Sequence, residues 1–290
     1  ENYKFDKAYF NSIVGRVGGR IANSQFILNN ITYKLSLNSF ESDHHLHGGK
    51  KGFNKKVWNI EDLIEEEEYL QCRLSYCSSD MEEGYPGNLK CKVDYIFSND
   101  NKLYINIAAE TDRDTIVNIT NHNYWNFHGH QNFHQDISEH YVQLNAEHYS
   151  ETNADLIPSG NLLGTKNTKF DFQELTKIDN RILDNNGIDT CYSVKDFNGI
   201  LRKVACAYSD LTKMGMTMYS DQPGLVFYTG NMMDNYYRGK YHRSYGYQYG
   251  MCFEPQLFPD AINQKNFKSP ILRAGKEYKS SIVIELKNDF

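Results

Sequence analysis

Apolar and polar residues alternate along many short segments of this chain. Between Leu103 and Ala109 every second residue is apolar, which places these side chains on one face of a strand. Other short runs rich in apolar residues are separated by turn-forming residues. These runs are residues 70–75, 89–97, 141–144, 224–230, 249–255 and 281–286. Regular short strands with little helix predict an all-β fold, a large antiparallel β-sandwich.

Turn and helix signals complete this picture. Asn29 and Asn30 separate two short apolar runs and predict a hairpin of residues 25–28 and 31–35, because asparagine tolerates the positive φ of a tight turn. Residues 170–182 are the only moderate helix candidate. Residues 1–14 suggest a short helical turn, and residues 156–160 a loop.

The segment from Thr115 to Phe127 reads as a strand with two different faces. Val117 and Ile119 point to one side. The opposite side carries Asn118, Thr120, His122 and Tyr124. Such a polar face is suited to lining a cleft for a polar ligand, and His122 is the side chain there that changes charge near neutral pH. The alternative is an ordinary hydrogen-bonded strand histidine.

A carboxylate interrupts the apolar run near the C-terminus. Cys252, Glu254 and Gln256 share one strand face. Because a carboxylate is rarely buried without a reason, Glu254 is a candidate functional residue. The alternative is a carboxylate on a solvated strand face.

A histidine-rich tract raises the question of a metal. His44, His45 and His47 lie close together before paired glycines. The tract lacks the His-Glu-x-x-His or paired Cys-x-x-Cys spacing that marks zinc sites. We therefore predict no metal site here.

Composition narrows the class of protein. The 290 residues carry a net charge of −6 and no basic cluster, which argues against nucleic-acid or anionic-membrane partners. No apolar run approaches the length of a transmembrane helix. The 22 Tyr and 16 Phe suit both strands and stacking against sugar rings. Six dispersed cysteines favour free thiols and a cytoplasmic location, although the first residue, Glu1, leaves a removed signal peptide open.

An ordered set of motifs gives a more specific interpretation: the chain resembles the aldose 1-epimerases, or galactose mutarotases. The resemblance runs from about residue 13 to the end and is highly specific because the motifs keep their order. The motifs are Gly15-Arg16, Arg20–Asn23, Leu46–Gly49, Gly52-Phe53, Trp58, Glu83–Leu89, Thr120–His122, Tyr124, Asn126, Asp155–Gly160, Gly187–Asp189, Gln222–Gly224, Tyr228–Asn231, Glu254–Gln256 and Pro259–Asn263.

The resemblance implies a fold, an activity and a site. The fold would be a large twisted antiparallel β-sandwich of the galactose-mutarotase type, forming one domain over residues 1–290. The activity would be interconversion of the α and β anomers of a free aldohexose, with Glu254 as catalytic base and His122 as general acid. Sugar-binding positions would be Arg20, His47, Asp189 and Gln222. No metal or organic cofactor is required, and we expect a monomer or homodimer with a small aldose as partner.

Departures from the family pattern qualify these expectations. Gly19 stands where the family commonly has Asn, and Thr190 where it commonly has His; we expect a weaker galactose preference or a shift to another aldose. Family members usually carry several dozen residues before the motif at Gly15. We therefore expect either a preceding segment or a sandwich without the first N-terminal strands, whose exposed edge would favour dimerisation.

Three competing functions stay open at this point. A non-catalytic sugar-binding module would keep the cleft without turnover, but all catalytic positions are present. A hexose-6-phosphate epimerase would need a cationic cluster at the cleft rim; the sequence shows only Arg16 and Arg20 near the site. A zinc hydrolase is the remaining alternative. A mutarotase-like cleft requires Glu254 and His122 to lie across one pocket.

Overall fold

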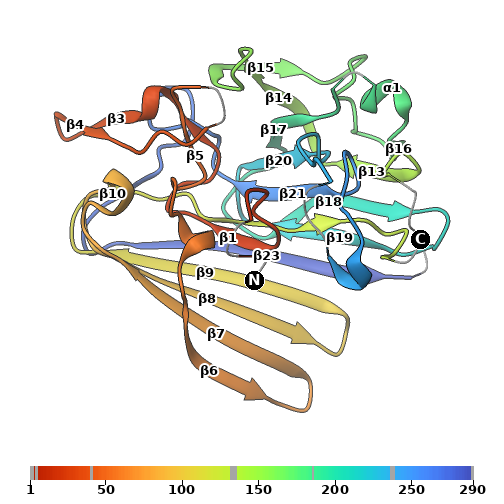
Figure 1. The fold of residues 1–290 in the computed structure, drawn as a ribbon, viewed down its shortest axis with the longest axis horizontal. Coiled ribbons are helices and arrows are strands. Elements are labelled where there is room, and N and C mark those ends of the chain that lie inside the picture. Colours follow the sequence, from red (N-terminus) through yellow and green to blue (C-terminus); the bar gives the residue numbers. More distant parts are fainter. Residues whose placement is uncertain are drawn as a thin grey trace.

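Two large antiparallel sheets build the molecule. The computed structural model describes residues 3, 6–39, 42–130, 136–184, 186–235 and 239–288. Within these ranges a nine-stranded and a six-stranded sheet lie one above the other, and four two-stranded ribbons surround them (Figure 1). The predicted all-β antiparallel sandwich is confirmed. No helix among the described residues is long and apolar enough to cross a membrane.

The nine-stranded sheet has the strand order β16-β13-β18-β19-β23-β9-β8-β7-β6. Its bounds are β6 (Asn59–Glu65), β7 (Tyr69–Ser78), β8 (Leu89–Ser98), β9 (Lys102–Thr111), β13 (His140–Leu144), β16 (Thr176–Lys177), β18 (Arg202–Ser209), β19 (Gly215–Ser220) and β23 (Glu277–Lys287). The last strand of the chain, β23, lies inside this sheet between β19 and β9.

The six-stranded sheet has the order β12-β21-β20-β17-β14-β15. Its bounds are β12 (Tyr124–Trp125), β14 (Ala146–Thr152), β15 (Pro158–Gly164), β17 (Asp189–Val194), β20 (Gly224–Tyr228) and β21 (Met251–Gln256). The ribbons pair β1 (Ser12–Val14) with β11 (Thr120–His122), β2 (Arg20–Ile21) with β5 (His45–Leu46), β3 (Gln25–Leu28) with β4 (Ile31–Lys34), and β10 (Thr115–Ile116) with β22 (Ile271–Leu272). Short 3-10 turns cover Ala22–Ser24, Phe53–Lys55, Glu82–Gly84 and Lys240–His242.

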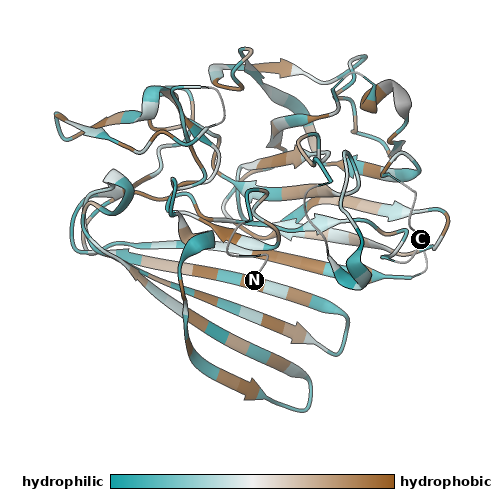
Figure 2. Cartoon of the chain, in the orientation of Figure 1, coloured by the Kyte–Doolittle hydropathy of each residue, from teal (hydrophilic) through white to brown (hydrophobic). Residues whose placement is uncertain are grey.

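The main hydrophobic core fills the space between the two large sheets. Val93 and Ile105 of the nine-stranded sheet and Phe227 and Phe253 of the six-stranded sheet belong to one buried cluster. Hydropathy alternates along β6 to β9, which extend beyond this cluster (Figure 2). On β8 and β9 this alternation gives one packed and one solvated face. In contrast, β6 is almost entirely exposed, and every residue of β20 and β21 is buried.

The sequence predicted the hairpin and the longer strands correctly, but it misplaced the helix. Strands β3 and β4 form the hairpin around Asn29 and Asn30. Residues 170–182 contain β16 and only the start of the four-residue helix α1 (Asn180–Leu183). The predicted helix is wrong because polar side chains inside this segment bond to nearby backbone: Asp171 accepts from Gln173 N, and Thr176 donates to Glu174 O.

Two further expectations concern short irregular segments. The expected loop at 156–160 ends inside strand β15, which begins at Pro158. Of the helical turn expected in residues 1–14, the structure describes Tyr3 in a 3-10 turn. Asp6 then accepts hydrogen bonds from the backbone N–H groups of Ala8 and Phe10, and strand β1 follows. The segment Thr115–Phe127 is divided into β10, β11 and β12.

Candidate active site

The register of the six-stranded sheet sets side chains in rows across one face. Tyr124 of β12 pairs with Cys252 of β21, which pairs with Tyr228 of β20, which pairs with Asp189 of β17. In the next row on the same face, Glu254 pairs with Val226. Because residues two apart share a face of a strand, both rows contribute to one surface.

A cavity of about 690 Å³ lies over this face. Loops from the N-terminal half of the chain and the ribbon strand β11 form its other walls. Its polar and aromatic lining residues include Asp6, Tyr9, Arg20, His47, His122, Tyr124, Asp189, Tyr228, Glu254 and Gln256. The volume and the mixed lining suit a polar small molecule.

His122 and Glu254 meet inside this cavity. His122 Nε2 lies 3.6 Å from Glu254 Oε1, and the two residues are only 4% and 2% exposed. Burial raises the pKa of Glu254 well above its usual range; the charge of Asp189 adds to this effect and Arg20 opposes it. Burial lowers the pKa of His122 to about 4. Burial therefore favours the neutral form of both groups.

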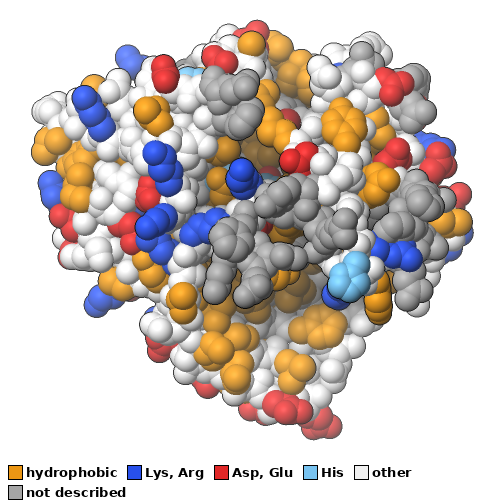
Figure 3. Space-filling view, in the orientation of Figure 1, with side chains coloured by type: hydrophobic (Ala, Val, Ile, Leu, Met, Phe, Trp, Pro, Cys, Tyr) orange, Lys and Arg blue, Asp and Glu red, His pale blue; other side chains and the backbone are white. Residues whose placement is uncertain are grey.

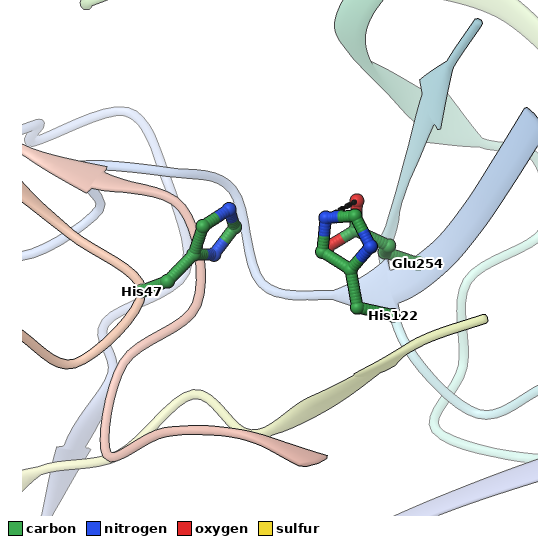
Figure 4. Close-up of side chains that lie close together, drawn as sticks. All are labelled: His47, His122 and Glu254. Atoms are coloured by element: carbon green, nitrogen blue, oxygen red, sulfur yellow. Dashed lines mark ion pairs between the residues drawn. The ribbon is translucent and has the colours of Figure 1, made fainter. Parts of the chain in front are cut away.

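His47 faces this pair from the opposite wall, on the loop after β5 (Figure 4). Its ring lies 5.5 Å from that of His122, edge to face. Gly48 follows with φ +84°, and a Cβ there would lie 1.7 Å from Gly15 O. Glu83 accepts hydrogen bonds from Lys50 N and Lys51 N, at 3.2 and 2.9 Å. The loop is thus held closely against the segment at Gly15 and the turn at Glu83.

A backbone hydrogen bond fixes the proton on His47. Gly19 N–H donates to His47 Nδ1 at 3.2 Å, so the neutral ring carries its proton on Nε2. Ligand atoms of His47, His122 and Glu254 lie within 4.8 Å of one another, close enough to suggest a metal site. The Gly19 bond disfavours it: a metal on Nδ1 would replace this bond, and a metal on Nε2 would require a proton on Nδ1. Nε2 is instead suited to donate to a hydroxyl.

Arg20 and Asp189 place opposite charges on the cavity wall. Burial raises the pKa of Asp189, and the nearby positive charge of Arg20 opposes the rise. Thr190 also lines the cavity, but its hydroxyl donates to Ser150 O at 3.2 Å. The threonine hydroxyl is therefore engaged with backbone. Gly19, the other departure, packs on Pro259 with φ +76°.

The structure brings together five of the six predicted site residues. Arg20, His47, His122, Asp189 and Glu254 all line the cavity; the exception is Gln222, which is not among the lining residues. The Gln222 amide donates to Asp221 at 2.8 Å. Gln222 lies two residues before Gly224, where β20 begins.

Sequence analysis did not identify Tyr9 as a residue of the site. Its ring lies 4.7 Å from that of His47 and 5.9 Å from that of His122. Tyr124 OH donates to Ala8 O at 3.0 Å, which fixes the turn that carries Tyr9. Burial raises the pKa of Tyr9 to about 12. The sequence feature that could have indicated this turn is Asp6, because an aspartate side chain often accepts hydrogen bonds from the backbone N–H groups that follow it.

Cationic side chains gather beside a hollow on one face of the molecule (Figure 3). Lys7, Lys50 and Lys55 line the cavity together with Arg20. The sequence had indicated no such cluster. Four carboxylates line the same cavity and balance these charges: Asp6, Asp189, Asp234 and Glu254.

Solved structures with the same fold define the class of protein. The chain superposes on an aldose epimerase homologue from C. elegans with a TM-score of 0.87, covering 100% of this chain and 86% of that one at 24% identity. A galactose 1-epimerase from Lactobacillus acidophilus gives a TM-score of 0.83 at 25% identity, covering 100% and 83%. The fold is that of the galactose mutarotases.

Sequence comparison specifies the family. The aldose 1-epimerase family profile matches residues 1–285. The galactose mutarotase of Bos taurus is 36% identical over 282 residues, which cover 96% of this chain and 79% of that protein. The aldose 1-epimerase of Haemophilus influenzae is 34% identical, covering 96% and 81%. The chain belongs to the aldose 1-epimerase family of isomerases.

Proposed function

We propose that the protein interconverts the α and β anomers of a free aldohexose, with galactose and glucose as substrates. The observation that carries this proposal is the buried His122–Glu254 pair, 3.6 Å apart on the wall of one polar cavity. The names of the related proteins, galactose mutarotase and aldose 1-epimerase, supply the sugar and the reaction.

The reaction needs one base and one acid. Glu254 takes the proton of the C1 hydroxyl while His122 protonates the ring oxygen, and the ring opens. Rotation about the C1–C2 bond presents the other face of the aldehyde. The same two groups then act in reverse and close the ring. His47 Nε2–H, Arg20 and Asp189 hold the hydroxyl groups of the sugar during both steps.

The proton count of the pair suits this cycle. A carboxylate with an imidazolium holds as many protons as a neutral carboxyl with a neutral imidazole. Ring opening converts the first state into the second, because Glu254 gains the proton and His122 loses one. Burial favours the neutral carboxyl with the neutral imidazole. It therefore lowers the free energy of the open-chain intermediate, in which the pair has this form. Arg20, which opposes the pKa rise of Glu254, helps to restore the carboxylate.

Polarimetry on freshly dissolved α-galactose and α-glucose tests the proposal. Wild-type protein should speed the approach to anomeric equilibrium above the rate in buffer, and the ratio of the two rates gives the sugar preference. A folded protein that leaves both rates at the buffer value would refute the proposed activity and favour a non-catalytic sugar-binding module.

The lysines favour a second candidate substrate, an aldose 6-phosphate. Lys7 and Lys50 are exposed at the cavity, where they would attract a phosphate. The four lining carboxylates oppose an anion, which is why the free sugar leads. Galactose 6-phosphate in the same polarimetric assay distinguishes them: a phosphosugar substrate should be turned over faster than galactose, and the advantage should fall as salt increases.

A further inference from the structure

Gln256 is a buried amide without a partner. It lines the cavity on the same strand face as Glu254, and its exposed fraction is 0%. Neither its Nε2 nor its Oε1 has a hydrogen-bond partner. An unpaired buried amide destabilises a fold, because each unmet group has lost its hydrogen bonds to water. A side chain of this kind at a cavity floor indicates hydrogen bonds that form when a ligand is bound.

The surroundings of Gln256 leave room for its amide. Oε1 lies only 2.5 Å from the point that a Cβ of Gly18 would occupy, so a larger residue at 18 would displace it. Gly224, which pairs with Gln256 across β20 and β21, carries no side chain either. The Oε1 end of the amide therefore lies against Gly18, in the segment that continues into Gly19 and Arg20.

A second orphaned atom lies on the same face. Glu254 Oε2 is buried without a hydrogen-bond partner, and Glu254 precedes Gln256 by two positions on β21. The carboxylate needs donors and the amide offers both donors and an acceptor. A polyol that reaches Glu254 presents neighbouring hydroxyl groups able to meet both. Rotatable side-chain bonds let the amide turn toward a hydroxyl at the cavity floor.

We propose that the Gln256 amide binds one hydroxyl group of the aldose and is a specificity-determining residue of this site. The inference rests on the proposed function, and it assigns to β21 a sugar contact besides the catalytic Glu254. It also supplies the cavity with an amide that Gln222, outside the lining, does not provide. The other source of a hydroxyl partner is an ordered water, and sugars lacking single hydroxyls distinguish the two.

The test compares wild type with Gln256→Met, which keeps the side-chain length and removes the amide. Anomer interconversion is measured on galactose and on its 2-, 3-, 4- and 6-deoxy analogues. On galactose the variant should lose about 10- to 100-fold in kcat/KM, as expected for one buried hydrogen bond. On the one analogue that lacks the bound hydroxyl, wild type and variant should differ by less than about threefold. Gln71→Met on β7 is the matched control and should leave all rates unchanged.

Two results would overturn the inference while the wild type stays active. Equal losses on galactose and every deoxy sugar would assign the amide to a water or to protein structure, and no loss on galactose would assign it no role. NMR of the wild-type Gln256 side-chain amide during a galactose titration gives an answer without turnover or a variant. A saturable shift supports the contact, and an unmoved signal refutes it. Wild-type inactivity on every sugar would instead count against the proposed function.

Discussion

Two pairs of oppositely ionisable side chains have different consequences: one lies on the nine-stranded sheet, and the other joins the six-stranded sheet to the ribbon strand β11. Arg73 of β7 and Asp94 of β8 form two hydrogen bonds, at 2.7 and 3.0 Å, with side chains 38% and 22% exposed. His122 and Glu254 lie farther apart, at 3.6 Å, and are almost fully buried. The pair with the shorter contacts is thus the one that is more exposed to water.

The comparison shows that desolvation, rather than contact distance, distinguishes a chemical site from a surface ion pair. Water and salt screen Arg73 and Asp94, so their attraction adds little to stability. Burial raises the pKa of Glu254 well above its usual range and lowers the pKa of His122 to about 4, so that each group favours its neutral form. Such strongly shifted pKa values in a cavity are typical of groups that exchange a proton with a substrate.

The largest expected effect comes from the buried pair. Glu254→Gln keeps the shape of the side chain and removes the base, so anomer interconversion should fall by about 10²–10⁴-fold. His122→Asn should act similarly. The melting temperature should stay at or above that of wild type for Glu254→Gln, because burial already disfavours the charge. An active Glu254→Gln variant would refute the assigned base.

The next effect concerns the loop that carries His47. Gly48→Ala should destabilise the protein by about 1–3 kcal/mol and lower activity, because its φ is +84° and its Cβ would meet Gly15 O. Gly199→Ala is the matched control: its φ is +79°, with nothing within 4 Å of its Cβ. Urea unfolding of both variants separates the steric contact from the backbone conformation. Equal losses would show that contact with Gly15 is unimportant.

Acid should destabilise the protein through its buried histidines. Burial lowers the pKa of His45 to about 4 and that of His140 to about 3. Between pH 6.5 and about 4 the unfolded chain therefore binds protons that the folded chain does not. The free energy of unfolding should decrease as the pH is lowered through this range. Urea titrations at several pH values should show this slope, with a smaller slope in His45→Gln. An unchanged slope would exclude His45 as a contributor.

The smallest effect is expected on the surface pair. Arg73→Ala should shift the melting temperature by less than about 4 °C and leave anomer interconversion unchanged. Thermal unfolding at low and high salt checks this expectation. A larger loss that persists at high salt would mean that β7 and β8 depend on this pair, and the contrast between the exposed pair and the buried pair would fail.

Alternation predicted much of the sandwich because it reflects burial directly. Strands such as β9, with one packed face, repeat every second residue and were found from the sequence. The helix predicted for residues 170–182 was wrong because spacing alone does not report local hydrogen bonding. Their apolar spacing resembles a helix, but the side chains of Asp171 and Thr176 satisfy backbone groups locally, a competition that spacing does not reveal.

The candidate site was predictable where a polar residue interrupts an apolar strand. Glu254 and His122 stood out for that reason, and the family resemblance added Arg20, His47 and Asp189. Tyr9 could not be found this way, because it lies on a turn that is set by Asp6 and by contact with Tyr124. Contacts between segments so distant in sequence leave no periodic signal.

The position of β23 sets the order in which the protein can fold. Glu277 at the start of this last strand pairs with Glu110 of β9, more than half the chain away. Neighbouring hairpins such as β7 to β9 close short loops and form early, whereas the β9–β23 ladder must close a long one. On refolding from denaturant, strand content should return before the cavity does. Recovery of enzyme activity will then report the slow, late closure of the sheet, a step that fluorescence from local hairpins would miss.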